Sequence, residues 1–222
     1  MNLSNLNFSR TLKIGVFSLM AFLSTNISYS QDFGADVVSS YVWRGTQFGS
    51  GVHIQPYMTL GSGNFEAGLW GSFPTTAEGG GNELDAYLSY DFGPLAITVT
   101  NYTFPGEGGF YSDGEGFFDG DYTEISGSTS IMGIDLLAGY FTEVEALYFE
   151  LGFGAGPVDI AIGYGEDQGD AFYANGGSGI VNMSFSGSKE IQISDSFSLP
   201  VFGSFILNPE AETAFLVFGI SF

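Results

Sequence analysis

The sequence predicts an all-β fold, a transmembrane antiparallel β-barrel of about 12 strands, from three observations. Segments of about ten residues alternate apolar and polar side chains, the period of strands that have one face in lipid. Short Gly- and Pro-rich turns alternate with longer acidic connections along the chain. The last segment, 213–222, is an apolar alternating strand that ends in Phe222. A soluble β-sandwich is the alternative, since its strands alternate in the same way.

The first thirty residues have the features of a secretory signal peptide. Two basic residues precede a short apolar core at 14–23, and the small residues Ser28 and Ser30 provide a cleavage site. The core is about half the roughly twenty residues that a spanning helix needs. We therefore expect residues 1–30 to be the signal and residues 31–222 to form one barrel.

Twelve strands are expected after the signal, most of them close to the length that crosses a bilayer at a tilt. In chain order they are 34–44, 51–60, 64–73, 83–92, 94–104, 121–131, 133–142, 146–155, 157–165, 180–193, 198–207 and 212–222. The apolar faces of the third, fourth and ninth are Phe65, Ala67, Leu69 and Phe73; Leu84, Ala86, Leu88 and Tyr90; and Val158, Ile160, Ile162 and Tyr164. The opposite faces carry carboxylates, hydroxyls and glycines, as in a barrel with apolar outer and polar inner faces.

Three of the expected strands depart from this pattern. The first, seventh and twelfth carry apolar residues on both faces. The phase of strand 180–193 also places Lys189 on the lipid face. A lysine costs little there if it lies near the interface, where its long side chain reaches water.

The connections fall into two sets that alternate along the chain. The short ones are 61–64, 91–94, 132–133, 154–157 and 194–196. The longer, acidic ones are 45–51, 74–82, 105–120, 142–146, 166–179 and 208–211. In bacterial outer-membrane barrels short turns face the periplasm and long loops face outward. The alternation therefore predicts that both termini lie on the periplasmic side.

Charge and cysteine content limit the possible partners. After residue 30 the only basic residues are Arg44 and Lys189, against all 25 acidic residues, a net charge of −23. Such a chain repels phosphate backbones, so nucleic acid is excluded as a partner. The chain has no Cys and hence no disulfide or thiolate metal site. The expected partners are outer-membrane lipid, the barrel-assembly machinery that reads the last strand, and small solutes.

The most distinctive stretch is the pattern Ser-x-Tyr-x-x-Arg-Gly at Ser39, Tyr41, Arg44 and Gly45. Together with the segments Phe65-Glu-Ala-Gly-Leu-Trp-Gly-Ser72, Asn208-Pro209 and Phe218-Gly-Ile-Ser-Phe222, this stretch resembles the TorF-like porin family of bacterial outer-membrane proteins. The resemblance covers both ends of the chain after the signal and is weak in the middle. It implies an outer-membrane barrel and solute passage, with no established substrate or catalytic residue.

Arg44 is the candidate functional residue of the lumen. Its phase in strand 34–44 places it on the same face as Asp36 and Ser40, the inner face. The acids expected on that face are Glu66, Glu83, Asp85, Asp91, Glu124, Glu150 and Asp159. Arg44 then either sets the field of a charge-selective constriction or pairs with carboxylates and plugs a narrow barrel. The residues leave both interpretations open.

Catalytic and metal sites are not expected. His53 is the only histidine, and a catalytic triad or a histidine metal cluster needs partners that the sequence does not supply. The acidic runs 113–121 and 166–170 are interpreted as solvated loops, with divalent-cation binding as the alternative. No cofactor, metal or enzymatic activity is predicted.

The sequence therefore predicts an outer-membrane β-barrel, a porin or narrow channel for small solutes with an acidic lumen. The alternative is a closed, non-conducting barrel with a structural or surface-binding role. Conductance across a lipid bilayer distinguishes the two.

Overall fold

A computed structural model describes residues 29–76, 80–105, 122–169 and 171–222. Within these ranges the regular structure consists of strands. They are β1 (Tyr29–Val38), β2 (Tyr41–Trp43), β3 (Thr46–Gly49), β4 (His53–Ser62), β5 (Phe65–Pro74), β6 (Glu83–Asp91), β7 (Ala96–Thr103), β8 (Tyr122–Ile131), β9 (Ile134–Phe141), β10 (Ala146–Ala155), β11 (Val158–Asp167), β12 (Ser178–Ser194), β13 (Phe197–Asn208) and β14 (Thr213–Ser221). No helix in the described ranges is long and apolar enough to cross a membrane.

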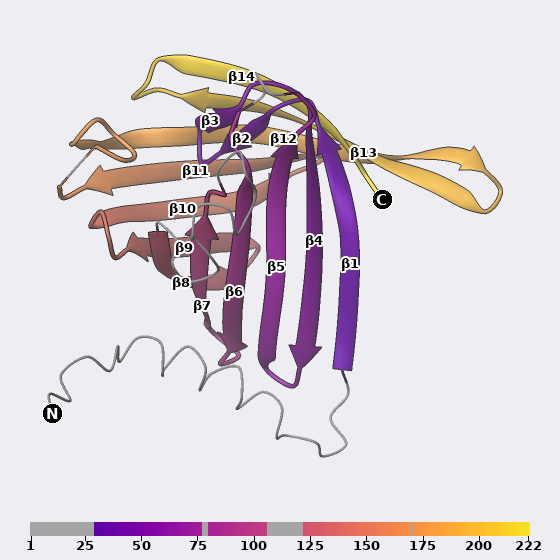
Figure 1. Cartoon of the computed structure of the whole chain (residues 1–222), viewed down its shortest axis with the longest axis horizontal. Helices are drawn as coiled ribbons and strands as arrows, with labels where there is room; N and C mark the ends of the chain where they lie inside the picture. Colours follow the sequence, from indigo (N-terminus) through magenta and orange to yellow (C-terminus); the bar gives the residue numbers. More distant parts are fainter. Residues whose placement is uncertain (1–28, 77–79, 106–121, 170) are drawn as a thin grey trace, which may run out of the picture.

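Twelve of these strands close into one antiparallel barrel (Figure 1). Each pairs with its neighbour in the chain from β4 to β14, and β1 pairs with both β4 and β14. The predicted closed barrel of 12 strands is therefore confirmed. Eleven strands begin and end within two residues of the expected positions, because apolar alternation bounded by Gly- and Pro-rich turns determines their limits.

The first strand is the exception. We expected it at 34–44, but β1 runs from Tyr29 to Val38 and pairs along its whole length with β4. Tyr29 and Ser30, placed in the signal by the sequence, are the first two residues of β1, opposite Ser62 and Gly61. Residues 1–28 lie outside the described part of the chain.

The segment after β1 turns into the barrel. Strands β2 and β3 form a separate two-stranded sheet joined by Arg44 and Gly45, both at positive φ (48° and 80°). Two successive residues at positive φ make the tight turn that suits a twisted two-stranded hairpin. We call β2, this turn and β3 the inner hairpin. Stretch 45–51, expected as an outer loop, is therefore wrongly assigned, since it contains β3.

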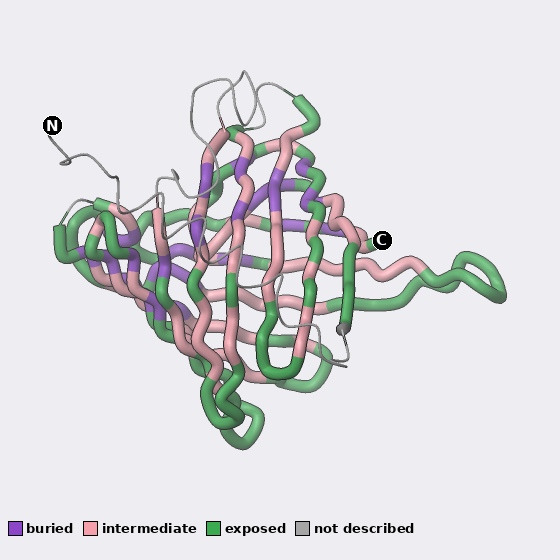
Figure 2. Tube along the Cα trace, turned by 60° about the horizontal axis from the view of Figure 1, so that its bottom comes forward, coloured by how far each residue is buried: buried purple, intermediate pink, exposed green. Residues whose placement is uncertain are grey.

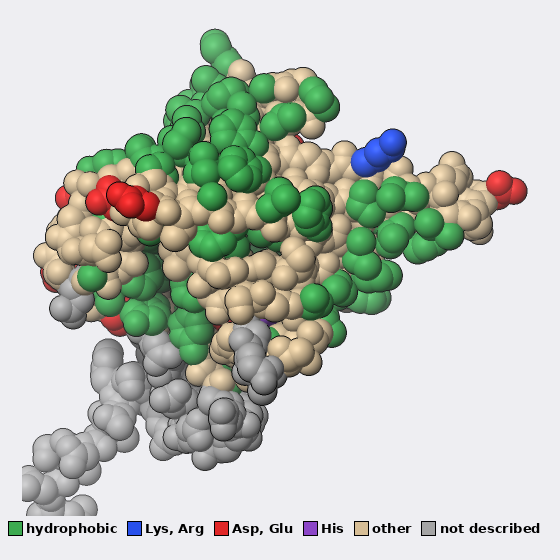
Figure 3. Space-filling view, turned by 90° about the horizontal axis from the view of Figure 1, so that it is seen from above, with side chains coloured by type: hydrophobic (Ala, Val, Ile, Leu, Met, Phe, Trp, Pro, Cys, Tyr) green, Lys and Arg blue, Asp and Glu red, His purple; other side chains and the backbone are tan. Residues whose placement is uncertain are grey.

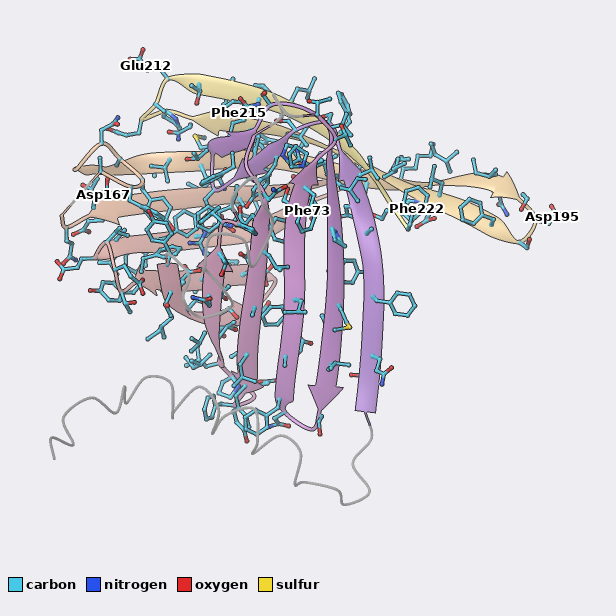
Figure 4. The ribbon with its side chains drawn as sticks, viewed as in Figure 1. Phe73, Asp167, Asp195, Glu212, Phe215 and Phe222 are labelled. Atoms are coloured by element: carbon cyan, nitrogen blue, oxygen red, sulfur yellow. The ribbon has the colours of Figure 1, made fainter. Side chains whose placement is uncertain are left out.

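The connections of the barrel do alternate in length. Those at one end span 63–64, 92–95, 132–133, 156–157 and 195–196, and we call this the short-turn end. Those at the other end span 39–52, 75–82, 104–121, 142–145, 168–177 and 209–212, and we call this the long-loop end. In Figure 4 the labelled Asp167 and Glu212 lie at the long-loop end, opposite Asp195 at a short turn.

The barrel closes over a short seam. β14 and β1 pair through Asp36↔Ser221, Val37↔Ile220 and Val38↔Gly219, and Phe222 exchanges backbone hydrogen bonds with Ala35. Past this point the β12–β13 hairpin leaves the wall and projects beyond the barrel (Figures 1 and 4). Only the last residues of β1, from Ala35 to Val38, are therefore paired with the end of the chain.

The inner hairpin also accounts for the strands that are apolar on both faces. Inward Phe141 of β9 belongs to one core cluster, against which inward Leu137 and Trp43 of the hairpin pack. Inward Val217 of β14 belongs to a second, against which Val42 packs. Figure 2 shows that the buried stretches lie along the barrel strands, while the projecting β12–β13 hairpin is exposed towards its tip. Apolar side chains on an inner face therefore mark where the hairpin is packed.

Candidate functional site

The guanidinium group of Arg44 lies inside the barrel, in contact with three of its walls. It forms two hydrogen bonds with the Glu124 carboxylate of β8, of 2.7 and 3.2 Å, and donates a third of 2.6 Å to the Tyr173 hydroxyl. Its central carbon lies 4.3 Å from the ring centre of Trp43 and 4.2 Å from that of Tyr148. Two-point binding of a carboxylate between aromatic faces is the geometry that arginine fits best.

The pair is shielded from water. The side chains of Arg44 and Glu124 are 10% and 3% exposed, and Tyr102 donates a 2.8 Å hydrogen bond to the second Glu124 oxygen. Burial raises the pKa of the Tyr173 phenol above its usual range, although nearby Arg44 lowers it, so Tyr173 stays neutral. Removing one partner of such a buried pair leaves an uncompensated charge, which is strongly destabilising.

Glycines make room for this site on the opposing strands. A Cβ atom on Gly139 would lie 1.9 Å from the Glu124 carboxylate, and one on Gly163 would lie 2.1 Å from the Tyr148 hydroxyl. At the hairpin tip, a Cβ on Gly45 would lie 1.8 Å from the carbonyl oxygen of Val181. Glycine within a strand often marks such a close approach.

The far side of the hairpin tip is bound by hydrogen bonds to the barrel. The Asn208 amide donates a 3.2 Å hydrogen bond to the Gly45 carbonyl. At the near side, Tyr41 packs on Trp70 and His53, with ring centres 5.4 and 6.0 Å apart. The inner hairpin therefore spans the lumen from β4 and β5 to β12 and β13 at the long-loop end.

Asp167 positions Tyr173. Its carboxylate accepts four backbone hydrogen bonds of 2.8–3.1 Å, from the amides of Phe172, Tyr173, Ala174 and Gly176. Asp167 belongs to the acidic run 166–170, which we interpreted as a solvated loop. The structure instead gives this carboxylate a structural role, since it is only 8% exposed. The other acidic run, 113–121, lies outside the described residues.

The acids expected in the lumen divide into two groups along the barrel. Glu83, Asp85 and Glu124 are buried near the inner hairpin, with 3%, 6% and 2% exposure. Among the described residues, the carboxylate that pairs with Arg44 is that of Glu124. Asp85 retains one buried oxygen without a hydrogen-bond partner in the described structure. No basic side chain in the described ranges forms an ion pair with Glu83 or Asp85.

The second group surrounds an open cavity in the other half of the barrel. This cavity of about 710 Å³ is lined by Asp91, Glu150 and Asp159, and also by Asp135, which sequence reasoning missed. Serines from β8 and β12 complete its polar wall. Glu66, the remaining expected acid, does not line it and accepts a 3.0 Å hydrogen bond from Tyr87.

Glu150 connects the two regions. Its carboxylate accepts hydrogen bonds from Tyr148, whose ring stacks on Arg44, and from the Asn182 amide at 3.2 Å. The ring that covers Arg44 is thereby oriented by an acid that faces the cavity.

Sequence reasoning identified Arg44 but placed it wrongly. It is not on a barrel strand with Asp36; it occupies the turn of the inner hairpin. Tyr41 and Trp43, which belonged to the expected wall strand 34–44, also lie inside the barrel. Tyr173 was not expected at all. The available signal was Gly45 at the second position after the apolar run 41–43, since glycine is typical of the second residue of a two-residue hairpin turn.

The candidates for metal or histidine chemistry are the acidic groups and His53. Among the described residues no group of three or more His, Asp or Glu side chains is arranged to hold a metal ion. The His53 ring is fully buried, and its Nδ1 lies 2.8 Å from the Gly51 carbonyl, to which it donates. His53 therefore fills space beside Tyr41.

No protein-family model matches the chain, and no curated protein matches it closely enough to be counted as a relative.

Proposed function

We propose that the chain is an outer-membrane β-barrel, a narrow channel for small cationic solutes that the inner hairpin closes at rest. The observation that carries this proposal is the position of the hairpin. It crosses the lumen at the long-loop end, held by the buried Arg44–Glu124 pair. Beyond it lies an acidic cavity of about 710 Å³. In this proposal the long loops face outward and the short turns face the periplasm.

The outer surface supports insertion into a bilayer. Many large apolar side chains on the outward phase of the barrel strands are more than a third exposed. They include Phe33, Ile54, Met58, Leu60, Val99, Ile125, Leu136, Phe149, Leu151, Phe205, Leu216 and Phe218. A water-soluble monomer rarely exposes so much contiguous apolar surface. Lipid is the partner that fits a closed barrel with this exterior.

The acidic lumen supports a preference for cations. Rings of carboxylates lining a pore favour cations, because they replace part of the ion's hydration and set a negative potential. Asp91, Asp135, Glu150 and Asp159 line the cavity without a basic neighbour among its lining residues. The proposal includes no catalytic role.

One observation favours the alternative, a permanently closed barrel. The Arg44 guanidinium group donates three hydrogen bonds, to Glu124 and Tyr173, and lies against two ring faces, so the hairpin has the contacts of a fixed structural element. The two functions differ in whether the hairpin ever leaves this position.

Planar-bilayer recording at low salt tests the proposal, since charge effects are least screened there. Arg44→Gln and Glu124→Gln each break the buried pair and should raise the open probability and yield a cation-selective conductance. Asp195→Asn, at an exposed turn, is the matched control and should behave as wild type. Silence of both variants, in protein verified as folded, would favour the closed barrel. Equal conductance in wild type and Arg44→Gln would remove the hairpin from the gating.

A further inference from the structure

A row of outward side chains crosses the seam of the barrel. Lys189 of β12 lies opposite Val201 of β13, Val201 opposite Ile220 of β14, and Ile220 opposite Val37 of β1. With about 4.8 Å between strands, the row extends roughly 14 Å from Lys189 to Val37. It therefore presents one positive charge followed by three apolar side chains.

In the neighbouring row, the positions on β12 and β13 are both glycines. Gly187 of β12 lies opposite Gly203 of β13, and the ring of Phe218 lies over Gly203, 3.3 Å from where a Cβ would stand. Neither glycine has a positive φ, so neither is required by the backbone. Glycines in mid-strand often mark a place where another group approaches the backbone closely.

These two rows border a groove of about 640 Å³, within the range of about 300–1,000 Å³ that small-molecule sites occupy. Its lining is mainly apolar, with Val37, Val201, Phe202, Phe218 and Ile220 beside Lys189. Figure 3 shows one basic group standing out beside hydrophobic side chains near the base of the projecting hairpin.

The charge in this groove has no internal partner. Lys189 forms no ion pair or hydrogen bond with any described residue. Apart from Arg44, which is buried inside, it is the only basic residue after residue 30. On a chain with 25 acids an isolated outward lysine beside an apolar groove fits a ligand with an anionic head and an apolar tail.

We propose that this groove binds a phospholipid with an anionic headgroup. The headgroup phosphate pairs with Lys189, and an acyl chain lies over Gly187 and against Val201, Ile220 and Val37. Lys189 lies near the short turn at 156–157, whose Pro157 also lines the groove. The headgroup therefore sits at the periplasmic interface. This site rests on the bilayer location given in the proposed function.

Charge and shape together select this ligand. A neutral headgroup gains nothing from Lys189, and a ligand without an apolar tail gains nothing from Val201, Ile220 and Val37. A basic side chain close to an anionic membrane surface favours anionic over neutral lipid by about fivefold. The expected preference is therefore modest and decreases as salt is added.

The test uses the full chain in phosphatidylcholine vesicles that contain trace spin-labelled phosphatidylglycerol or spin-labelled phosphatidylcholine. Spectra of the motionally restricted label give the relative affinity of the two lipids for the protein. Wild type should prefer phosphatidylglycerol by about fivefold at low salt. Lys189→Gln should abolish the preference, and Lys189→Arg should retain it.

Three further variants separate the groove from general effects. Gly187→Leu fills the space over Gly187, where an added Cβ meets only the Pro157 carbonyl at 3.4 Å, and this variant should also lose the preference. Gly127→Leu, at an outward glycine of β8 with ordinary contacts of 3.4 Å and more, should retain it. Glu190→Gln changes the charge at the next residue and should retain it as well.

The outcomes are distinct. An inserted wild type with equal affinity for the two lipids, or a Lys189→Gln variant with wild-type preference, would overturn the site. So would loss of preference in Gly127→Leu, because the effect would then not belong to this groove. A wild-type chain that does not insert into vesicles would instead contradict the membrane location itself.

Discussion

Arg44 combines an unfavourable backbone conformation with side-chain contacts on several sides of its guanidinium group. Its φ of 48° is uncommon for a residue other than glycine. Its guanidinium group is held by a carboxylate, a phenol and two aromatic rings. A strained residue persists only where its surroundings determine its position strongly. Single residues around Arg44 should therefore have larger effects than their own contacts suggest.

Gly139 offers one such residue-scale prediction. In Gly139→Ala the new methyl group would overlap the Glu124 carboxylate, which must move away from Arg44. We expect the free energy of unfolding to fall by about 1–3 kcal/mol, the cost of a buried charged group left poorly paired. Urea unfolding in micelles measures it. Gly127→Ala is the control, with contacts of 3.4 Å and more, and an equal loss there would exclude the Glu124 explanation.

Asp167 gives a second prediction at the scale of single residues. In Asp167→Ala, four backbone amides of the 168–177 connection lose their acceptor, and Tyr173 loses its position beside Arg44. Proteolysis should then cut within 168–177 at least tenfold faster than in wild type, because local opening becomes easier. Asp195→Ala, at an exposed turn, should leave the cutting rate unchanged. Wild-type resistance in Asp167→Ala would show that other contacts hold the connection.

At the scale of elements, the inner hairpin is what the sequence predicted least well. Segment 34–44 is apolar on both faces, and Ser39 and Ser40 in its middle are as compatible with a strand as with a bend. The wall strands were predictable because most of them have one apolar and one polar face and all are bounded by turns or loops. The hairpin has no such environment, since both of its faces contact the barrel interior.

The candidate site was predictable only in part, for the same reason. The phase of each strand gave the inward set of acids without their partners. Which acid meets Arg44 depends on how far the hairpin reaches across the lumen, and this is not encoded in any local period. The indirect signal was the apolar inner face of strands such as β9 and β14, where Phe141 and Val217 pack around the hairpin.

The tip of the hairpin gives an element-scale prediction with a close control. Gly45 (φ 80°) and Gly133 (φ 79°) have nearly the same positive φ, so alanine costs about 1–2 kcal/mol of backbone strain at either position. Only at Gly45 does the added Cβ meet the Val181 carbonyl, at 1.8 Å; Gly133 has nothing within 4 Å. Gly45→Ala should therefore lower the unfolding midpoint more than Gly133→Ala and expose Trp43 to an aqueous fluorescence quencher. Equal midpoints and unchanged quenching would contradict the packing of the tip against β12.

At the scale of the whole molecule, closure depends on few contacts. β14 and β1 share three residue pairs, whereas β1 and β4 share ten. The two hydrogen bonds between Phe222 and Ala35 extend this short ladder, while the Phe222 ring is 67% exposed. The backbone and the ring of the last residue thus have separate roles.

Two variants separate those roles. Deleting Phe222 removes both hydrogen bonds and the ring, whereas Phe222→Ala removes only the ring. If the seam limits stability, the deletion should lower the heat-resistant folded fraction in refolding experiments, and Phe222→Ala should not. If the ring is the address read by the assembly machinery, both should reduce the folded protein in cells. Wild-type refolding of the deletion variant would show that the seam does not limit stability.

The reach of the inner hairpin also sets an order of folding. Its contacts join positions far apart in the chain: Arg44 to Glu124 over 80 residues, Arg44 to Tyr173 over 129, and Gly45 to Asn208 over 163. Contacts with such large separations form late, because the intervening chain must first be ordered. The residues that receive Gly45 do not exist as a surface until β12 and β13 are paired. We therefore expect the hairpin to dock last, so that the wall of a newly made molecule is nearly complete while its interior is still unobstructed.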